Sequence, residues 1–484
     1  MTEALADDSV CIGGVFGRAY DRNEGALTIN NCDNSGSIEY NAPQSATTYD
    51  LYVGGIAGYA SGRVYLSNCD NTGEKVYSSF GTQGGVVGVG GLVGYLVMSA
   101  NDNVSNEGNR TTLETCTNSA NVSSYIKESK DVVCVGATVA AWYASGAKFY
   151  QQMSNTTNTG NLVVSNGSST DKSITYAGFI GTTFVSGASD KTNWGGLKDC
   201  KLTNCINGVE GGNNTLTVTG KHYTVYAGGM VGYNFMHFVV SGSSNNMAYV
   251  SDADVAYSHN YGGLYGYCIS KSEFKTTAIK NEALTTTKMT HNITGYVNNG
   301  AITVSASVAG TLNVAGLIGI INDSSKNMHM KINGVTNNGN INVAGSGNVT
   351  YTNLYVAGLI AKMATKAGTG STYTITNDQV NLGNITVSGL TPGEGAATFI
   401  GGAVGCLTKD LSNFKSNCTL TVDADMPAGM LAGDVSTCGF AFTNSAVGGK
   451  LVEGTNETVI TASNLAQYLF SDRVLTSYSG VSLY

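Results

Sequence analysis

One short motif recurs through the whole chain: a glycine, two apolar residues, and then a glycine or an alanine. Ten copies and one degenerate copy (Ala-Thr-Val-Ala) start at Gly14, Gly55, Gly91, Ala137, Gly178, Gly229, Gly263, Gly316, Gly358, Gly402 and Gly429. The first and last copies lie 415 residues apart. The mean period is therefore about 41 residues, which is typical of repeat arrays. Because each unit of such an array contacts mainly its neighbours, the motif predicts a stacked, elongated fold.

A turn motif follows most copies of the glycine motif. It reads Asn-Cys-Asp-Asn-Ser-Gly from Asn31 and Asn-Cys-Asp-Asn-Thr-Gly from Asn68. An alternating stretch comes next in most repeats, for example Asn-Leu-Val-Val-Ser from Asn161. Each repeat therefore reads as three short strands separated by Asn/Gly turns. The low charged fraction of 12% and the 27 tyrosines also favour strands over helices.

Three strands per repeat, stacked repeat on repeat, predict an all-β parallel β-helix (β-solenoid). We expect about eleven coils with variable loops, right-handed because crossover connections in parallel sheets nearly always are. Coils spaced ~4.8 Å apart would give a rod on the order of 50 Å long. Two coils per repeat would double that length, but three strand signals per repeat favour one.

Asparagines occupy one equivalent place in the turn motif, where their side chains bond the backbone and tolerate a left-handed conformation. They are Asn34, Asn71, Asn118, Asn158, Asn207, Asn298, Asn337 and Asn381. Stacked in successive coils, their amides can form a hydrogen-bonded ladder. We therefore interpret them as structural.

Four of the eleven cysteines share another position of the turn: Cys32, Cys69, Cys116 and Cys205. Stacked strands bring equivalent residues within disulfide reach, but parallel side chains disfavour the dihedral angle that a disulfide needs. We expect a ladder of buried, reduced thiols, which pack as small apolar groups. Disulfides among them and metal binding are the alternatives. No CxxC pair occurs, and no metal or cofactor is expected.

The motifs resemble a known family. Gly-Gly-Ile-Ala-Gly-Tyr at Gly54 and Gly-Gly-Leu-Val-Gly-Tyr at Gly90, each followed by the Asn-Cys turn, are similar to the GLUG repeat. The resemblance covers about Ile12 to Asp434 and weakens after Gly263. GLUG repeats occur in bacterial surface proteins and adhesins, including those of gut Bacteroidetes. The resemblance implies a surface location and carries no catalytic residues.

Charge and hydropathy exclude several function classes. The net charge of −8 leaves no basic footprint for nucleic acid. No run of lysines and arginines could hold an anionic membrane, and no apolar stretch is long enough to cross one. Residues 1–10 do not read as a signal peptide. We expect an extracellular or outer-membrane surface protein whose signal was removed, or an excised segment of a larger surface protein.

Catalytic chemistry has weak candidates. Sugar-cleaving enzymes need paired carboxylates, and the best pair here is Asp252 with Asp254, which reads as a solvated loop. No basic partner is apparent at the same repeat position. The histidines are scattered without ligand spacing, and the glycine-rich runs lack the Lys-Ser/Thr of a phosphate loop. We therefore expect no catalysis.

Two features could contact a ligand. Tyrosines crowd the N-terminal third, and Tyr52, Tyr59 and Tyr65 are the ones we single out. A long insertion between repeats contains Trp194. Aromatic rings can stack on sugars, although tyrosine is also an ordinary strand residue. The partner we expect is a host or bacterial surface glycan or a protein.

The sequence thus predicts two parts: β-helix repeats over residues 1–456 and a capping segment over residues 457–484. Ser463 to Phe470 reads as a short helix with Ser463 as N-cap. The leading function is a structural or adhesin module of a bacterial surface. A polysaccharide-degrading β-helix enzyme and a phage-type receptor-binding spike are the alternatives.

Overall fold

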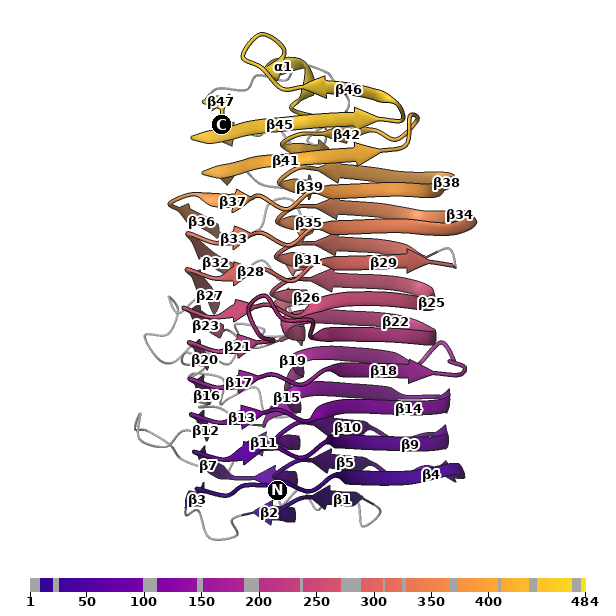
Figure 1. The fold of residues 1–484 in the computed structure, drawn as a ribbon, viewed down its shortest axis with the longest axis vertical. Coiled ribbons are helices and arrows are strands. Elements are labelled where there is room, and N and C mark those ends of the chain that lie inside the picture. Colours follow the sequence, from indigo (N-terminus) through magenta and orange to yellow (C-terminus); the bar gives the residue numbers. More distant parts are fainter. Residues whose placement is uncertain are drawn as a thin grey trace, which may run out of the picture.

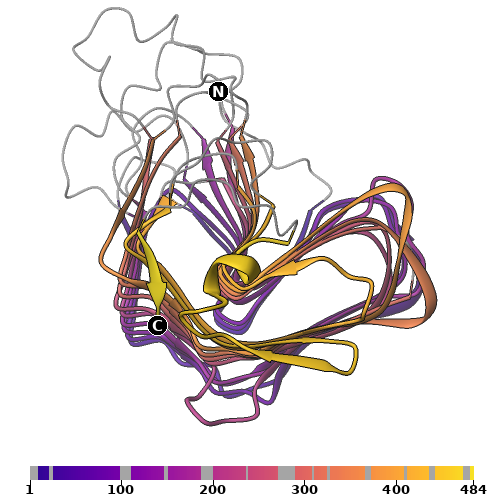
Figure 2. The same ribbon diagram turned by 90° about the horizontal axis from the view of Figure 1, so that it is seen from above.

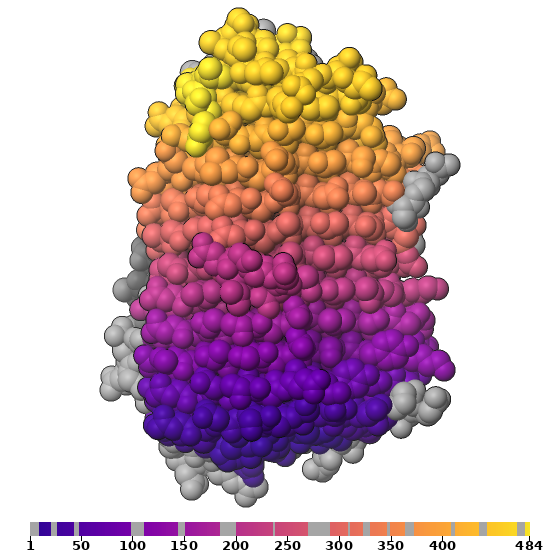
Figure 3. Space-filling model, in the orientation of Figure 1, coloured from indigo at the N-terminus to yellow at the C-terminus, as the bar shows by residue number. Residues whose placement is uncertain are grey.

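The computed structural model describes residues 9–20, 26–98, 111–145, 151–186, 200–235, 238–270, 289–307, 310–323, 328–365, 372–407, 411–434, 442–471 and 480–484. Almost all of its regular structure is β-strand, and nearly every strand pair is parallel. The strands run across the long axis in stacked rungs, from the N-terminal end to the C-terminal end (Figure 1). The space-filling view shows the same succession of layers (Figure 3).

Each rung contributes to five columns of stacked strands. The first column precedes the glycine motif: β1 (Val10–Gly13), β5 (Leu51–Gly54), β10 (Val87–Gly90), β15 (Val132–Ser145), β19 (Ile174–Ser186), β22 (Thr215–Asn234), β25 (Ala248–Gly262), β30 (Thr311–Ala315), β34 (Ile341–Ala357), β38 (Ile385–Gly401) and β42 (Ala428–Gly429).

The second column follows the glycine motif: β2 (Phe16–Tyr20), β6 (Ala57–Ser61), β11 (Val93–Met98), the later parts of β15, β19 and β22, β26 (Tyr265–Ser270), β31 (Ile318–Asp323), β35 (Ile360–Thr365), β39 (Val404–Cys406) and β43 (Ala432–Asp434). The third column is a separate nine-stranded sheet: β3 (Ala26–Asn30), β7 (Arg63–Ser67), β12 (Thr111–Glu114), β16 (Gln151–Ser154), β20 (Cys200–Thr203), β23 (Phe238–Ser241), β27 (Met289–Thr294), β32 (Met328–Asn333) and β36 (Thr372–Thr376).

The fourth column is the turn motif, which forms very short strands: β8 (Asp70–Asn71), β13 (Thr117–Asn118), β17 (Thr157–Asn158), β21 (Ile206–Asn207), β24 (Ser244–Asn245), β28 (Val297–Asn298), β33 (Thr336–Asn337) and β37 (Gln379–Asn381). The fifth column is the alternating stretch: β4 (Ile38–Thr47), β9 (Lys75–Gln83), β14 (Asn121–Ser129), β18 (Leu162–Asn166), the first parts of β22, β25, β34 and β38, β29 (Ile302–Ala306), β41 (Phe414–Val422) and β45 (Ser445–Glu453).

The prediction of an all-β chain with parallel strands is confirmed, and the stacked rungs are compatible with the predicted β-helix (Figure 2). The count of three strands per repeat is wrong. The turn motif pairs as a short strand of its own, and the glycine motif separates two strands in most rungs, although it lies within one continuous strand in β15, β19 and β22. A further strand precedes the turn.

The main core is a continuous cluster of buried, mostly aliphatic residues between the columns. It arises because alternate residues of each strand point inward, as Val53 and Val89 do in register on β5 and β10. Layers of mostly Val, Ile and Leu, with buried aromatic residues such as Phe80 and Tyr261 among them, then stack rung on rung. The same alternation places the intervening side chains on the opposite face of each strand.

The C-terminal segment covers the last rungs. β46 (Asn456–Val459) pairs antiparallel with β45, and β47 (Val481–Leu483) pairs parallel with it. Between them lies the helix α1 (Leu465–Tyr468), followed by the buried side chains of Leu469 and Phe470. The helix is shorter than expected, and its N-cap is Asn464 instead of Ser463. A small parallel pair, β40 (Leu411–Ser412) and β44 (Phe442–Thr443), completes the described strands.

Candidate ligand-binding site

The two columns on either side of the glycine motif face each other and enclose aromatic side chains outside the main core. On β5 Val53 belongs to the main core, whereas Tyr52 belongs to a separate cluster. The rings of Tyr52 and Tyr59, on β5 and β6, lie 5.9 Å apart between centroids. We call this aromatic interface between the first and second columns the seam.

Glycine allows the chain to turn at the base of the seam. A Cβ atom on Gly55 would lie 2.1 Å from the carbonyl oxygen of Gly91 and 2.4 Å from Cγ of Asn71. Both contacts are far too close for a side chain, so at Gly55 the backbone of this rung can rest on the next only through glycine. The glycine motif and the asparagine of the turn motif are therefore parts of one packing arrangement.

The N-terminal part of the seam is a stack of tyrosines. Tyr59 and Tyr95 are nearly parallel at 5.9 Å, and Tyr95 continues to Tyr143 at 6.2 Å. The Tyr52 hydroxyl donates a hydrogen bond to Asp50 Oδ2 at 2.9 Å. The Arg18 guanidinium lies 5.6 Å from the Tyr59 ring centroid, as in a cation–π contact.

The middle of the seam is a second stack. Tyr176 lies parallel to Tyr226 at 5.5 Å, and Tyr233 lies parallel to Tyr267 at 5.2 Å. Tyr226 also contacts Tyr267 edge-to-face at 5.1 Å. Burial, ahead of the neighbouring phenols, raises the pKa of Tyr226 and Tyr233. These phenols are therefore neutral hydroxyl donors at physiological pH.

Amides replace the tyrosines in the next rungs of the seam. Asn260 and Asn313 follow Tyr226 in register, and Nδ2 of Asn313 donates to Oδ1 of Asn260 at 3.0 Å. Ser258 Oγ donates to the same oxygen at 3.1 Å. Oδ1 of Asn313 is buried and has no hydrogen-bond partner among the described residues. Further along, the Lys362 ammonium lies 4.1 Å from the ring centroid of Tyr355.

An aromatic pair with one exposed ring lies where β22 and β25 enter the seam. Tyr257 is 60% exposed and stacks on Tyr223, with centroids 5.2 Å apart and planes 9° from parallel. The register between β22 and β25 shifts here, after His222 and before Thr224, so β25 carries one extra residue. Such bulges redirect side chains. The bulge places Tyr257 on the outside of the molecule instead of in the seam.

The predicted ligand-contacting residues are separated by the structure. Tyr52 and Tyr59 meet in the seam, but they are only 3% and 6% exposed, so their rings are not open platforms. Tyr65 lies on β7 in the nine-stranded sheet, is 37% exposed, and donates to Glu114. Trp194 lies outside the described residues. Sequence reasoning missed Tyr257 and Asn313, although the change from Tyr to Asn at one repeat position was a readable signal.

The asparagines form a continuous ladder in the fourth column. Each Nδ2 donates to the Oδ1 of the next rung at 2.7–3.2 Å, in the order Asn34, Asn71, Asn118, Asn158, Asn207, Asn245, Asn298, Asn337 and Asn381. Asn245 was not predicted as a ladder residue, because its turn reads Ser-Gly-Ser-Ser-Asn and lacks the Asn-Cys pattern. Beyond Asn381 the ladder position is Ser416.

The cysteines are not one uninterrupted row. Cys32, Cys69 and Cys116 occupy successive rungs, but Thr156 precedes Cys205 at the same position. Cys69, Cys116 and Cys205 are buried free thiols, whereas Cys32 is partly exposed because no described rung covers it. Burial raises the pKa of Cys205 to about 12. Thiols such as Cys69, which donates to Ser67 O at 3.1 Å, serve as small buried donors.

The carboxylate pair does not lie in a loop. Asp252 and Asp254 point outward from β25, where Asp254 is in register with Lys221 of β22. The expectation of a loop without a basic neighbour is therefore wrong, because these residues belong to the alternating outer face of a strand. Within the described residues, no group of three or more His, Cys, Asp or Glu side chains is placed to hold a metal ion.

Three histidines are buried inside the middle rungs. Nδ1 of His222 lies 2.8 Å from Thr175 Oγ1, and its Nε2 lies 2.9 Å from the Thr219 carbonyl oxygen. Neither ring nitrogen of His259 has a hydrogen-bond partner among the described residues. His291 lies beside the Cys268 thiol at 3.8 Å. Burial lowers the pKa of these imidazoles to about 4, 3 and 4, respectively.

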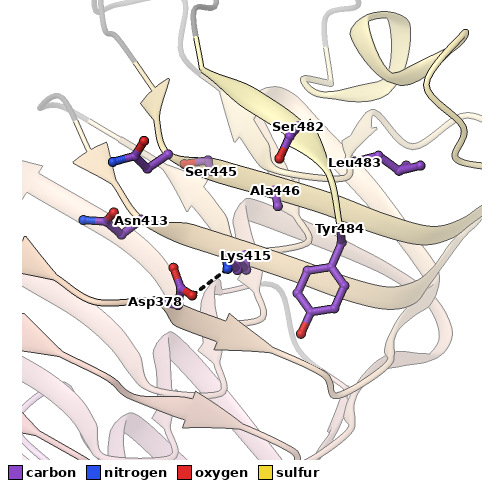
Figure 4. Close-up of a pocket in the computed structure, with 9 residues that line it drawn as sticks. Asp378, Asn413, Lys415, Ser445, Ala446, Ser482, Leu483 and Tyr484 are labelled. Atoms are coloured by element: carbon purple, nitrogen blue, oxygen red, sulfur yellow. Dashed lines mark hydrogen bonds and ion pairs between the residues drawn. The ribbon is translucent and has the colours of Figure 1, made fainter.

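An open cavity of about 510 Å³ lies beside the C-terminal strand β47 (Figure 4). It is lined by Asp378, Asn413, Lys415, Asn444, Ser445, Ala446, Ser482, Leu483 and Tyr484. Lys415 forms an ion pair with Asp378 at 2.5 Å, so these two charged side chains of the cavity are already paired with each other. No buried orphan group points into the cavity from among the described residues.

No helix in the described part of the chain has the length and apolar character needed to cross a membrane. Comparisons with protein-family models, with curated proteins and with solved structures found no match for this chain.

Proposed function

We propose that the chain is a right-handed parallel β-helix of about eleven coils that acts as a structural or adhesin module on a bacterial surface. Eleven strands paired in sequence along the first column support this architecture. The asparagine ladder ties the rungs together along one line. The likeness of the turn and glycine motifs to GLUG repeats supports the extracellular location.

The proposed activity is non-catalytic binding of a surface glycan or a protein. The observation that carries it is the seam, a row of uncharged aromatic and amide groups, together with the Tyr223–Tyr257 pair at its entrance, in which Tyr257 is exposed. Aromatic rings and uncharged hydrogen-bonding groups are the usual lining of sites that recognise neutral ligands. Binding of nucleic acid is not part of the proposal, because the chain is acidic.

The test has two arms. In the first, the purified chain is screened on an array of host and bacterial glycans and against surface proteins of both, and we expect saturable binding of at least one. In the second, the chain is incubated with a panel of polysaccharides while new reducing ends and unsaturated products are measured. We expect no turnover by the wild type or by the Asp252→Ala, Asp254→Ala double variant.

Two outcomes would replace the proposal. Turnover by the wild type that is lost in the double variant would favour a polysaccharide-degrading enzyme, in which Lys221 beside Asp254 supplies the cation. A stable trimer in light scattering would favour a receptor-binding spike. Absence of any ligand in the first arm would leave only a structural role.

A further inference from the structure

We propose that the strip from Tyr257 to Asn313 is an oligosaccharide-binding site for uncharged sugars, with Tyr257 as the stacking platform and Asn313 as a hydrogen-bond acceptor. This inference rests on the proposed binding function and narrows it to one site and one ligand class. It involves no covalent step.

The stacking platform is one open face of the Tyr257 ring. Tyr223 in the preceding rung covers one face, with the planes 9° apart. In the following rung the equivalent residue is Gly310, one position before Thr311, which pairs with Ser258. A Cβ atom at Gly310 would lie 3.0 Å from the carbonyl oxygen of Tyr257. Among the described residues of this rung, glycine therefore places no side chain at the position that follows Tyr257, and Tyr257 remains 60% exposed.

A pyranose ring suits such a platform. Its axial C–H groups form an apolar face that stacks on an aromatic ring, while its hydroxyls stay hydrated at the edges. Tyr223 supports the platform from behind, so little conformational freedom is lost on binding. An exposed tyrosine without this support, such as Tyr125 on β14, would lose more.

The proposed hydrogen-bond acceptor is an amide oxygen in the seam that lacks a donor in the described part of the chain. Asn313 is fully buried, and its Oδ1 has no donor among the described residues. Turning the amide over does not help, because Nδ2 already donates to Asn260 Oδ1 at 3.0 Å and the exchange would place two oxygens together. A buried acceptor without a donor is costly. A hydroxyl group of a ligand would supply the missing hydrogen bond.

Solvent reaches the facing column of the seam at this level, where Ile320 and Lys362 are both partly exposed. Asn313 itself is buried, so a ligand contacts its Oδ1 only after side chains of the facing column move aside. The polar side chains near Asn313 on the first column are Ser258, Asn260, Thr311 and Asn353, and none of them carries a charge. The Lys362 ammonium is engaged by the ring of Tyr355, the residue in register with Asn313. The unpaired acceptor calls for a ligand that donates a hydrogen bond, as a sugar hydroxyl does and a carboxylate does not.

Spacing sets the size of the ligand. Tyr257 and Asn260 are three residues apart on β25, which corresponds to about 10 Å along a strand. Asn313 lies one rung beyond Asn260. A single sugar ring cannot span that distance, so the ligand must contain at least two linked rings, lying across the first column.

The experiment is calorimetric titration with neutral hexasaccharides: cellohexaose, xylohexaose, mannohexaose and chitohexaose. We expect at least one to bind. Tyr257→Ala should weaken its binding by tenfold or more and Tyr257→Phe by less than twofold, because the ring face and not the hydroxyl makes the contact. Asn313→Ala should weaken binding by about fivefold. Tyr125→Ala, an exposed tyrosine on another strand, is the matched control and should leave binding unchanged.

The outcomes separate this inference from the proposed function. A hexasaccharide that binds the Tyr257→Ala and Asn313→Ala variants as well as the wild type would overturn the site, while the binding function would stand. Failure of all four sugars at millimolar concentration would overturn the ligand class, and the glycan and protein screen then decides the function independently. Melting temperatures of each variant equal to that of the wild type exclude misfolding as the cause of a loss.

Discussion

Nδ2 of Asn71 lies 2.8 Å from Oδ1 of Asn118, one rung further along the molecule. The same nitrogen also donates to the carbonyl oxygen of Gly91 at 2.8 Å. Asn71 thus joins two rungs through its side chain and also holds the backbone of the glycine motif, as Asn207 and Asn381 do through the carbonyl oxygens of Gly229 and Gly402. The two sequence motifs share one period because they meet where these rungs stack.

Replacing a central ladder asparagine should destabilise the protein. In Asn118→Ala, Nδ2 of Asn71 loses an acceptor and Oδ1 of Asn158 loses a donor. Two buried amide groups that each lose a hydrogen-bond partner should together lower the free energy of unfolding by about 2–4 kcal/mol. Urea denaturation followed by circular dichroism measures the loss. Asn121→Ala, an exposed asparagine three residues away, is the control, and an equal effect of both variants would contradict the ladder's contribution.

Thr115 should be the least favourable corner residue. Its φ of 54° lies in the left-handed region, where the equivalent residues of neighbouring rungs are Asn68 and Asn155. A β-branched side chain is strained there, whereas asparagine is tolerated. Thr115→Asn should therefore stabilise the protein by about 0.5–1 kcal/mol, seen as a raised melting temperature. Thr117→Asn, two residues later, should give no such gain.

The sequence predicts the strand class and the repeat unit well, because glycine and asparagine are needed at fixed places where rungs touch. The prediction fails where the motif changes although the position in the rung still has the same structural role. Asn245 joins the ladder from a turn without the Asn-Cys pattern, and Ser243 replaces cysteine two residues earlier. Residues can therefore occupy the same position in successive rungs even where the surrounding sequence motif differs.

The seam could not be predicted from local pattern alone. Its tyrosines come from two strands of each rung, and Tyr52 meets Tyr95 of the following rung at 4.5 Å. Alternation places Tyr52 on the face opposite Val53, but it does not reveal whether that face meets solvent or another strand. The angle that the chain adopts at the glycine motif decides this. Tyr65 also alternates with buried residues in its strand, β7, but its side chain remains on the surface.

Deleting the residues after Glu457 should make the protein aggregate. The deletion removes half of β46 and all of β47, which both hydrogen-bond to β45, and it removes the buried Leu469 side chain. An unpaired strand edge then becomes a template for association. Light scattering during mild heating measures this. Leu469→Asp should act in the same direction, whereas Val459→Thr, at an exposed position, should not; a monomeric truncation of unchanged stability would show that the segment is no cap.

Acidification should destabilise the middle rungs through the buried histidines. Burial lowers the pKa of His222, His259 and His291 to about 4, 3 and 4, from an ordinary value near 6.5. Between those values the unfolded chain binds more protons than the folded chain. The stability is therefore fully present above pH 6.5 and decreases as the pH falls towards 4. Urea midpoints measured at pH 7.5 and pH 5 should show the decrease.

His259 offers the sharpest version of this test, because neither of its ring nitrogens has a hydrogen-bond partner among the described residues. His259→Leu keeps the apolar packing of β25 and removes one titrating group, so the difference between the two urea midpoints should shrink. His222→Leu should lower stability at both pH values, because Thr175 Oγ1 loses its partner in that variant. If His259→Leu leaves the pH dependence unchanged, protonation of this imidazole does not govern the acid sensitivity, and the other buried histidines, His222 and His291, must be responsible.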